Sequence, residues 1–356
     1  MYQNTEHILK NIIFCLIALC SGVVVKGQIR SEVNAFLGIG FAADQKAHGN
    51  TGVALPSGSG AFWYNPSLGA QNDGHNIHYS HSALFANLAV FDVLSYSKKI
   101  SDDLGIGIGF ARLGVDDIQN TLALFDGEQN VDYSRISLFS ASDQVLFLSA
   151  NKKWKQYTIG VGAKVIYRKI GSFAQAFGLG FDVGISGKMK GFDVGAVLKD
   201  GTTTTSYWVM NFSDAEKQTL DFTGNEIPEN GTESLLPHLE LGISKKWTIS
   251  DKFAARPILD LGIYPGIQRG NLIETSWLSL EPKIGGQVLY KEVFVLNMGI
   301  ERFQRFKLSD GTTQSQVSPT LGVELRLKKF RIQYGLSTIG NDSDLLNNVF
   351  GIGLTF

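Results

Sequence analysis

Three histidines lie close together and are the first residues whose type and spacing could bind a metal ion: His75, His78 and His81. Imidazole nitrogens are common metal ligands, but a metal site needs them to converge on one point. Side chains on a β-strand alternate between two faces, so His78 would point away from His75 and His81. We therefore interpret the three as ordinary residues at the start of a strand and predict no metal site.

Signatures of cofactor binding and of hydrolysis are equally weak. Gly38-x-Gly40-x-x-Ala43 has the spacing of a dinucleotide-binding fingerprint, but no strand–helix–strand pattern surrounds it. The sequence contains no G-x-S-x-G nucleophile motif. We predict that the protein is not an enzyme and has neither a catalytic residue nor a cofactor. A hydrolase that brings a serine and a histidine together from neighbouring strands stays open as an alternative.

The N-terminal segment predicts export. Lys10 precedes a short apolar run at 12–25, and a cleavage site follows, so we assign a signal peptide to 1–27. The run is shorter than the ~20 apolar residues that span a bilayer, which disfavours a membrane anchor. Both cysteines, Cys15 and Cys20, lie inside this segment, so the mature chain would contain no disulfide and no cysteine-bound metal.

The composition fits a membrane β-barrel better than a soluble protein. Charged residues make up 18% of the 356 residues, against about 25% in typical soluble proteins. The chain contains 40 glycines, and aromatic residues reach 11%. The formal net charge of −1 indicates no basic face for binding nucleic acid.

An alternation of apolar with small or polar residues recurs along the chain, and 157–168 shows it most clearly. One face of this segment is an apolar row with a tyrosine at each end, and the other carries small or charged residues. Ten steps of ~3.3 Å, tilted by about 40°, cover roughly 25 Å, the height of the apolar band of an outer-membrane barrel. The pattern therefore predicts a lipid-facing strand. A soluble sandwich is the alternative, and the export signal and the terminal aromatic residues count against it.

Fourteen such segments are predicted, an even number as in other single-chain outer-membrane barrels. They are 75–83, 88–98, 103–113, 143–153, 156–168, 175–187, 191–199, 236–247, 252–264, 277–290, 292–306, 316–327, 329–338 and 346–356. Short connections alternate with longer ones, above all 114–142 and 200–235, and in such barrels the short turns face the periplasm. We predict an all-β fold: a transmembrane antiparallel up-and-down barrel over 75–356, surrounded by lipid of a Gram-negative outer membrane.

The segment 28–74 precedes the first strand, and its part 36–70 is rich in glycine and small residues. Eight strands already close on their own side chains, so a barrel of about fourteen strands has room for a filler. We predict that 28–74 is an N-terminal hatch inside the lumen. Alternation places ten charged residues on the luminal face, where they can pair with each other and with the hatch: Lys164, Arg168, Asp182, Asp193, Glu240, Arg256, Asp260, Glu301, Glu324 and Arg326.

Two motifs of the hatch frame a run of small residues at 49–61. The first is Phe36-Leu37-Gly38-Ile39-Gly40, and the second is Trp63-Tyr64-Asn65-Pro66-Ser67, an aromatic-Asn-Pro-small motif before the first strand. This arrangement resembles the PorV/PorQ family, a branch of the FadL-like outer-membrane barrels. The resemblance implies a fourteen-stranded barrel with a hatch that works with type IX secretion, receiving cargo at the translocon and delivering it to the attachment machinery. Asn50-Thr51 stands where a Met-Gly is usual, so a central subunit and a divergent paralogue both stay open.

Two functions follow from these patterns. The first is a barrel associated with type IX secretion, which binds cargo or partner proteins at the cell surface through 114–142 and 200–235. The alternative is a FadL-like transporter of hydrophobic small molecules. It predicts an apolar cavity in the lumen, for which the candidate residues are Phe36, Phe41, Phe62 and Trp63.

Overall fold

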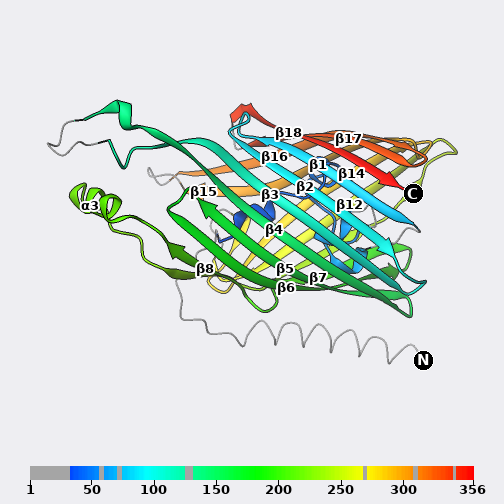
Figure 1. Cartoon of the computed structure of the whole chain (residues 1–356). Coiled ribbons are helices and arrows are strands. Elements are labelled where there is room, and N and C mark those ends of the chain that lie inside the picture. The colour runs from blue at the N-terminus through cyan, green and yellow to red at the C-terminus, as the bar shows by residue number, and fades with distance from the viewer. Residues whose placement is uncertain are drawn as a thin grey trace.

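The computed structural model describes residues 33–55, 60–69, 74–124, 131–267, 271–307, 312–339 and 342–356. These residues form one closed antiparallel β-barrel of fourteen strands, with the N-terminal segment inside it (Figure 1). The predicted fold class is confirmed. The predicted signal peptide, 1–27, lies outside the described residues. No helix in the described ranges is long and apolar enough to cross a membrane.

Each strand of the ring pairs with the next, and the ring closes where the first strand pairs with the last. The uninterrupted strands are β1 (His75–Leu84), β2 (Ala89–Lys99), β3 (Leu104–Asn120), β4 (Ser137–Trp154), β5 (Tyr157–Ile170), β6 (Ala174–Met189), β12 (Phe253–Pro265), β14 (Leu278–Tyr290), β15 (Phe294–Lys307), β16 (Thr313–Leu327), β17 (Phe330–Ile339) and β18 (Asp342–Thr355). Two short strands, β11 (Trp247–Thr248) and β13 (Ile273–Glu274), pair with β12 and β14.

The remaining two strands of the ring are each interrupted, and the two interruptions lie side by side in the wall. The first consists of β7 (Phe192–Lys199) and β8 (Thr204–Met210), which both pair with β6. The second consists of β9 (Gly231–Leu235), which pairs with β8, and β10 (His238–Ser244), which pairs with β7. At the first interruption, three residues of β6 (180–182) face six residues (199–204) of the other strand.

The prediction that 200–235 is one loop is therefore wrong. Asp200-Gly201 forms a turn within the wall, and Gly201 donates its backbone N–H to the carbonyl of Phe181 on β6 at 2.8 Å. The chain thus returns to the neighbour it left and continues as β8. The connection between β8 and β9 carries the helix α3 (Asp214–Phe222).

The prediction that 114–142 is a loop is also wrong at both ends, where 114–120 belong to β3 and 137–142 belong to β4. β3 and β4 stay paired as far as Asn120 and Ser137, so their ribbon projects beyond the barrel (Figure 1), with the short helix η4 (Tyr133–Arg135) near its tip. Pairing satisfies backbone N–H and C=O groups that an open loop would leave to water. We call this end of the barrel the loop end and the opposite end, where the chain terminates, the turn end.

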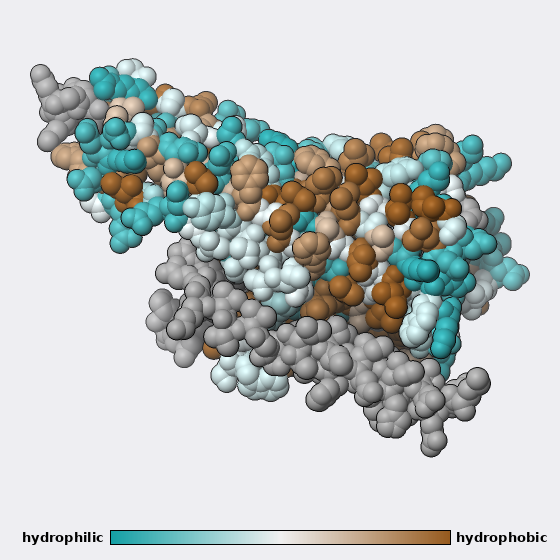
Figure 2. All heavy atoms as spheres, turned by 60° about the horizontal axis from the view of Figure 1, so that its bottom comes forward, coloured by the Kyte–Doolittle hydropathy of each residue, from teal (hydrophilic) through white to brown (hydrophobic). Residues whose placement is uncertain are grey.

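The outer surface of the barrel is apolar. In β3, Leu104, Ile106, Ile108 and Phe110 are exposed, while the glycines between them are buried. Figure 2 shows such apolar side chains gathered over the wall, whereas hydrophilic residues dominate the projecting loop end. A band of this kind needs lipid around it, because so large an apolar patch is unfavourable in water.

The N-terminal segment lies in the lumen, and we call its described part, 33–55 and 60–69, the hatch. It contains η1 (Ala35–Gly38), α2 (Ala43–Ala47), η2 (Ala61–Trp63) and η3 (Pro66–Leu68), drawn in blue in Figure 1. Asn65 caps η3: its Oδ1 accepts from the Ser67 N–H at 3.1 Å, and its Nδ2 donates to the Val53 carbonyl at 2.9 Å. Proline at the next position fits, because the first helical residue needs no N–H donor.

Candidate functional site between the hatch and the barrel wall

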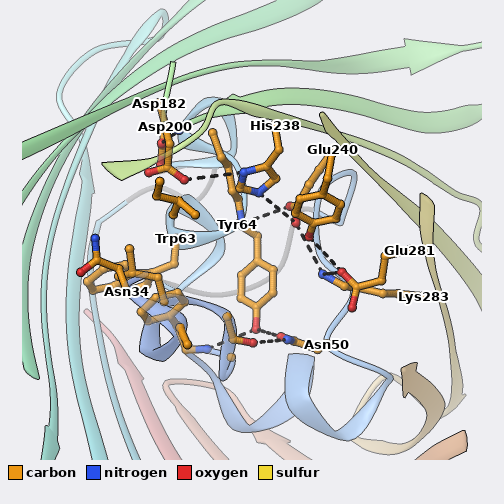
Figure 3. Close-up of a pocket in the computed structure, with 18 of the residues that line it drawn as sticks. Asn34, Asn50, Trp63, Tyr64, Asp182, Asp200, His238, Glu240, Glu281 and Lys283 are labelled. Atoms are coloured by element: carbon orange, nitrogen blue, oxygen red, sulfur yellow. Dashed lines mark hydrogen bonds and ion pairs between the residues drawn. The ribbon is translucent and has the colours of Figure 1, made fainter. Parts of the chain in front are cut away.

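A cavity of about 250 Å³ separates the hatch from the wall formed by β5–β7, β10, β12, β14 and β15 (Figure 3). Two different surfaces enclose it. One is aromatic and consists of hatch residues that pack on β4. The other is charged and consists of luminal residues beside the two interrupted strands. The interruption itself places Asp200 in this second surface.

The aromatic side is a stack of rings. Phe41 lies parallel to Trp63 at a centroid distance of 4.3 Å, and Trp63 stacks on Phe147 of β4 at 5.1 Å. The indole N–H of Trp63 donates to Ser95 Oγ at 2.8 Å, which orients the ring. The stack belongs to an apolar cluster that continues over the luminal faces of β1–β5 and includes Leu84, Phe91, Val93, Val145 and Ile166.

On the charged side, lysines pair with carboxylates. Lys164 Nζ lies 2.9 Å from Asp182 Oδ1 and also pairs with Asp200. Glu240 receives two lysines, Lys199 at 3.0 Å and Lys283 at 3.4 Å. Buried charges that are paired in this way avoid most of the cost of losing water.

Tyr64 stands between the two sides (Figure 3) and ties the hatch together. Its hydroxyl donates to Asn50 Oδ1 at 2.6 Å and accepts from the Phe41 N–H at 3.2 Å. Burial raises the pKa of Tyr64 well above its usual value, so the phenol stays neutral. Beneath it, Lys46 pairs with Glu301 of β15 at 2.6 Å and fixes the hatch to the wall.

The hatch-motif residues predicted from the sequence are brought together only in part. Trp63, Tyr64 and Gly40 line the cavity. Phe36 belongs to the apolar cluster, and Asn65 and Pro66 anchor η3 against the wall. Of the pocket residues expected for a transporter, Phe41 and Trp63 line the cavity, whereas Phe36 and Phe62 pack behind it.

The ten predicted luminal charges fall into three groups. Lys164, Asp182, Glu240 and Glu301 line the cavity. Arg168 lies toward the loop end, where it pairs with Asp143 at 2.7 Å. The other five lie toward the turn end or below the hatch: Asp193, Arg256, Asp260, Glu324 and Arg326. Asp260 is the most specific of them, because its Oδ2 accepts from the backbone N–H groups of Gly52 and Val53 at 2.6 and 3.0 Å.

Several cavity residues were not predicted. Lys283 and Glu281 could have been found, because they alternate with the apolar outward residues of β14. Lys199, Asp200 and His238 could not, since they lie at the interruption that the sequence presents as the ends of a loop. The histidines considered first share no site: His78 is buried and bonded to Gln333 at 2.9 Å, while His81 faces outward and contacts Asp92 at 2.8 Å. No group of metal-binding side chains occurs among the described residues.

No known family profile matches the sequence, and no curated protein matches it. Solved structures do match its fold. The monoaromatic hydrocarbon channel CymD has a TM-score of 0.57 and 13% identity, over 89% of this chain and 98% of that chain. The toluene transporter TodX of Pseudomonas putida gives 0.56 and 14%, with the same coverages. The toluene transporter TbuX of Ralstonia pickettii gives 0.54 and 16%, again with the same coverages.

A FadL homologue of Pseudomonas aeruginosa is also similar, with a TM-score of 0.50 and 10% identity over 89% of this chain and 98% of that chain. These neighbours are channel and transporter barrels, not enzymes. At such low identity the likeness concerns the fold. The chain therefore has the fold of the FadL-like barrels of Gram-negative outer membranes.

Proposed function

We propose that this protein is an outer-membrane channel for small, largely apolar molecules, which pass through the cavity beside the hatch. The observation that carries the proposal is the aromatic stack of Phe41, Trp63 and Phe147, which continues into an apolar luminal surface over β1–β5. A water-filled pore would have a polar lumen instead. Structures described as toluene and monoaromatic hydrocarbon channels share the fold, which supports the same kind of cargo.

The size of the cavity limits that cargo. An apolar cavity of about 150 Å³ holds a benzene molecule, so the 250 Å³ of this cavity suits a compound with a single ring. The apolar outer band supports a location in outer-membrane lipid, which the protein would reach by means of its N-terminal signal. Larger molecules would require the hatch to move.

A variant that fills the cavity tests the proposal. Ala35 lines the cavity and is exposed, so Ala35→Trp adds a large ring there without disturbing a packed core. Uptake of labelled toluene would be measured in cells whose own outer-membrane channels are deleted. The wild-type protein should speed uptake, and the variant should return it to the rate without the protein. Ala215→Trp, on the exposed α3, is the matched control. Wild-type uptake no faster than background would refute the channel.

A role in type IX secretion is the second candidate, and the projecting β3–β4 ribbon favours it. Tyr133 and Leu138 on this ribbon are 74% and 61% exposed, as is common for protein contacts. The hatch motif does not by itself support the secretion role, because Asn65 and Pro66 already have a structural role in anchoring η3. Replacing 115–138 by a tight turn and then measuring surface display of secreted cargo separates the two functions. Normal display together with normal toluene uptake would count against the secretion role.

A further inference from the structure

Lysine occurs in every short connection at the turn end of the barrel. Six connections join neighbouring strands there, and each contains or adjoins at least one lysine. One lysine from each connection is Lys99, Lys155, Lys190, Lys246, Lys291 and Lys329. The segments concerned contain 13 lysines, no arginine and four carboxylates, and they are 98–103, 152–156, 188–191, 245–252, 291–293 and 328–329. The turn end therefore carries a net positive charge.

A long connection at the loop end carries the opposite charge. It is the segment 211–230 between β8 and β9, which includes α3 and contains five carboxylates and one lysine. The chain as a whole is almost neutral, with a formal net charge of −1. Charges of both signs, mixed over the surface, would serve solubility equally well. The concentration of lysine at one end therefore indicates an anionic partner at that end.

Most of this positive charge is not neutralised within the protein. Lys152, Lys155 and Lys329 are exposed, and none of the three forms an ion pair with another described residue. Lys246 does pair with a carboxylate of the same end, Glu292, at 2.5 Å. Exposed pairs of this kind are weak. The lysines are thus available to a partner outside the barrel.

Exposed aromatic rings beside the lysines indicate their depth in the membrane. Trp154 and Trp247 are 43% and 51% exposed and lie at the turn ends of β4 and β11. Lys155 Nζ lies 5.3 Å from the ring centroid of Trp154, and Lys291 Nζ lies 5.6 Å from that of Tyr290. Aromatic girdles of outer-membrane barrels mark the edges of the apolar band. The lysines next to these rings therefore lie at the depth of the lipid headgroups.

Phospholipid fits these observations better than a protein partner does. The six connections follow one another around the closed ring of strands, so the lysines surround the barrel as the lipid does. A protein docked on the turn end would need neither a complete ring of lysines nor exposed aromatic rings beside them. Short turns of outer-membrane barrels face the periplasm, and the periplasmic leaflet of that membrane consists of phospholipid.

We propose that the lysines of the turn end bind the headgroups of anionic phospholipids in the periplasmic leaflet, in preference to zwitterionic phospholipids. Each ammonium group donates hydrogen bonds to phosphate oxygens and is attracted by the negative potential of an anionic leaflet. In a zwitterionic lipid, the cation of the same headgroup opposes this attraction. The inference concerns the outer surface of the barrel and does not depend on the cargo of the channel.

Quenching of tryptophan fluorescence by brominated lipids measures this preference. Trp154 is the reporter, and Trp247→Phe/Trp277→Phe removes the other exposed tryptophans, since Trp63 and Trp208 are buried. The barrel would be refolded into phosphatidylcholine vesicles in which the same minor fraction of lipid is brominated phosphatidylglycerol or brominated phosphatidylcholine. Both leaflets have the same composition, so the direction of insertion does not affect the result.

At low salt we expect phosphatidylglycerol to be enriched about fivefold over phosphatidylcholine beside Trp154, the effect of about one lysine near an anionic surface. High salt should reduce this enrichment, because salt screens exposed charges. Equal quenching by the two brominated lipids would overturn the proposal, and an acidic periplasmic protein would become the better candidate. Enrichment that is insensitive to salt would also contradict it.

Lys152→Gln/Lys155→Gln, made in the same reporter protein, removes two exposed charges beside Trp154 and should abolish most of the enrichment. Lys169→Gln/Lys217→Gln is the matched control, because these lysines are also exposed but lie toward the loop end. The control should keep the full enrichment. Full enrichment in the turn-end variant, or an equal reduction in both variants, would show that the lysines of the turn end are not the binding groups. Heat-modifiable migration in gels establishes that each variant is folded.

Discussion

Asp260 of β12 is the residue through which the wall holds the backbone of the hatch. Its Oδ2 accepts hydrogen bonds from Gly52 and Val53 at 2.6 and 3.0 Å. In Asp260→Ala both backbone N–H groups lose their acceptor and stay buried. We expect a loss of about 1–3 kcal/mol in the free energy of unfolding, measured by urea titration of tryptophan fluorescence.

Asp193→Ala is the control for this change. Asp193 is also luminal, but its ion pair with the largely exposed Lys188 spans 4.0 Å. An exposed ion pair of this kind contributes little to stability. Equal losses of unfolding free energy for the two substitutions would mean that the contact of Asp260 with the hatch does not stabilise the fold.

His48 gives the hatch a dependence on pH. It is fully buried, its Nδ1 bonds to Thr51 Oγ1 at 2.8 Å, and burial lowers its pKa from 6.5 to about 4. The unfolded chain therefore binds more protons than the folded one between these two values. The stabilisation is complete above pH 6.5 and is lost as the pH falls toward 4, by about 3 kcal/mol in total. In His48→Gln the unfolding free energy should change less with pH over this window. An unchanged profile of denaturant midpoint against pH would contradict the assignment.

Luminal glycines let the elements of the hatch approach the strands. A Cβ on Gly160 of β5 would lie 2.2 Å from the Ser67 nitrogen and 2.3 Å from the Pro66 carbonyl carbon, both backbone atoms of η3. Gly160→Ala should therefore cost about 1–3 kcal/mol through overpacking. Gly286→Ala on β14 is the control, because its nearest neighbour would be 3.9 Å away. The test is the shift in unfolding midpoint, and an equal shift for both alanines would show that contact with the hatch does not matter.

The strands themselves were largely predictable, because a period of two residues is a local signal. The apolar row of β5, for example, identifies its length and its outward face without any knowledge of its neighbours. The interruption between β7 and β8 was not predictable. Asp200-Gly201 is an ordinary turn sequence, and Asp200 and Thr203 both adopt positive φ there. Whether such a turn ends a strand or only bends it depends on the hydrogen bonds to β6, which the sequence of one strand does not contain.

At the scale of the whole molecule, the barrel and its hatch form one unit whose interior has two unlike sides. The pairing of luminal charges with each other and with the hatch follows from their balanced numbers, as Lys164–Asp182 and Lys46–Glu301 illustrate. The apolar luminal surface at Phe91 and Val145 could not be predicted from the sequence. An apolar residue in an alternating strand can face lipid or a plug equally well, and only the position of the hatch decides which.

We expect the hatch to be the element that closes the lumen. A fourteen-stranded barrel is too wide for its own side chains to fill, and the residues of the hatch are mostly buried in the lumen. Deleting 36–70 should therefore turn a closed barrel into an open one. Single-channel recordings in planar bilayers should show a steady, large conductance for the deletion variant and almost none for the full chain.

The deletion also removes stabilising contacts, so its fold must be established separately. Heat-modifiable migration in gels reports whether the barrel is still closed, and the recording counts only for protein that passes this criterion. The ion pair between Lys46 and Glu301 offers a milder test, because Lys46→Met breaks it and leaves Glu301 buried without its lysine. That variant should open intermittently rather than permanently. Low conductance in a folded deletion variant would mean that side chains of the wall, and not the hatch, seal the lumen.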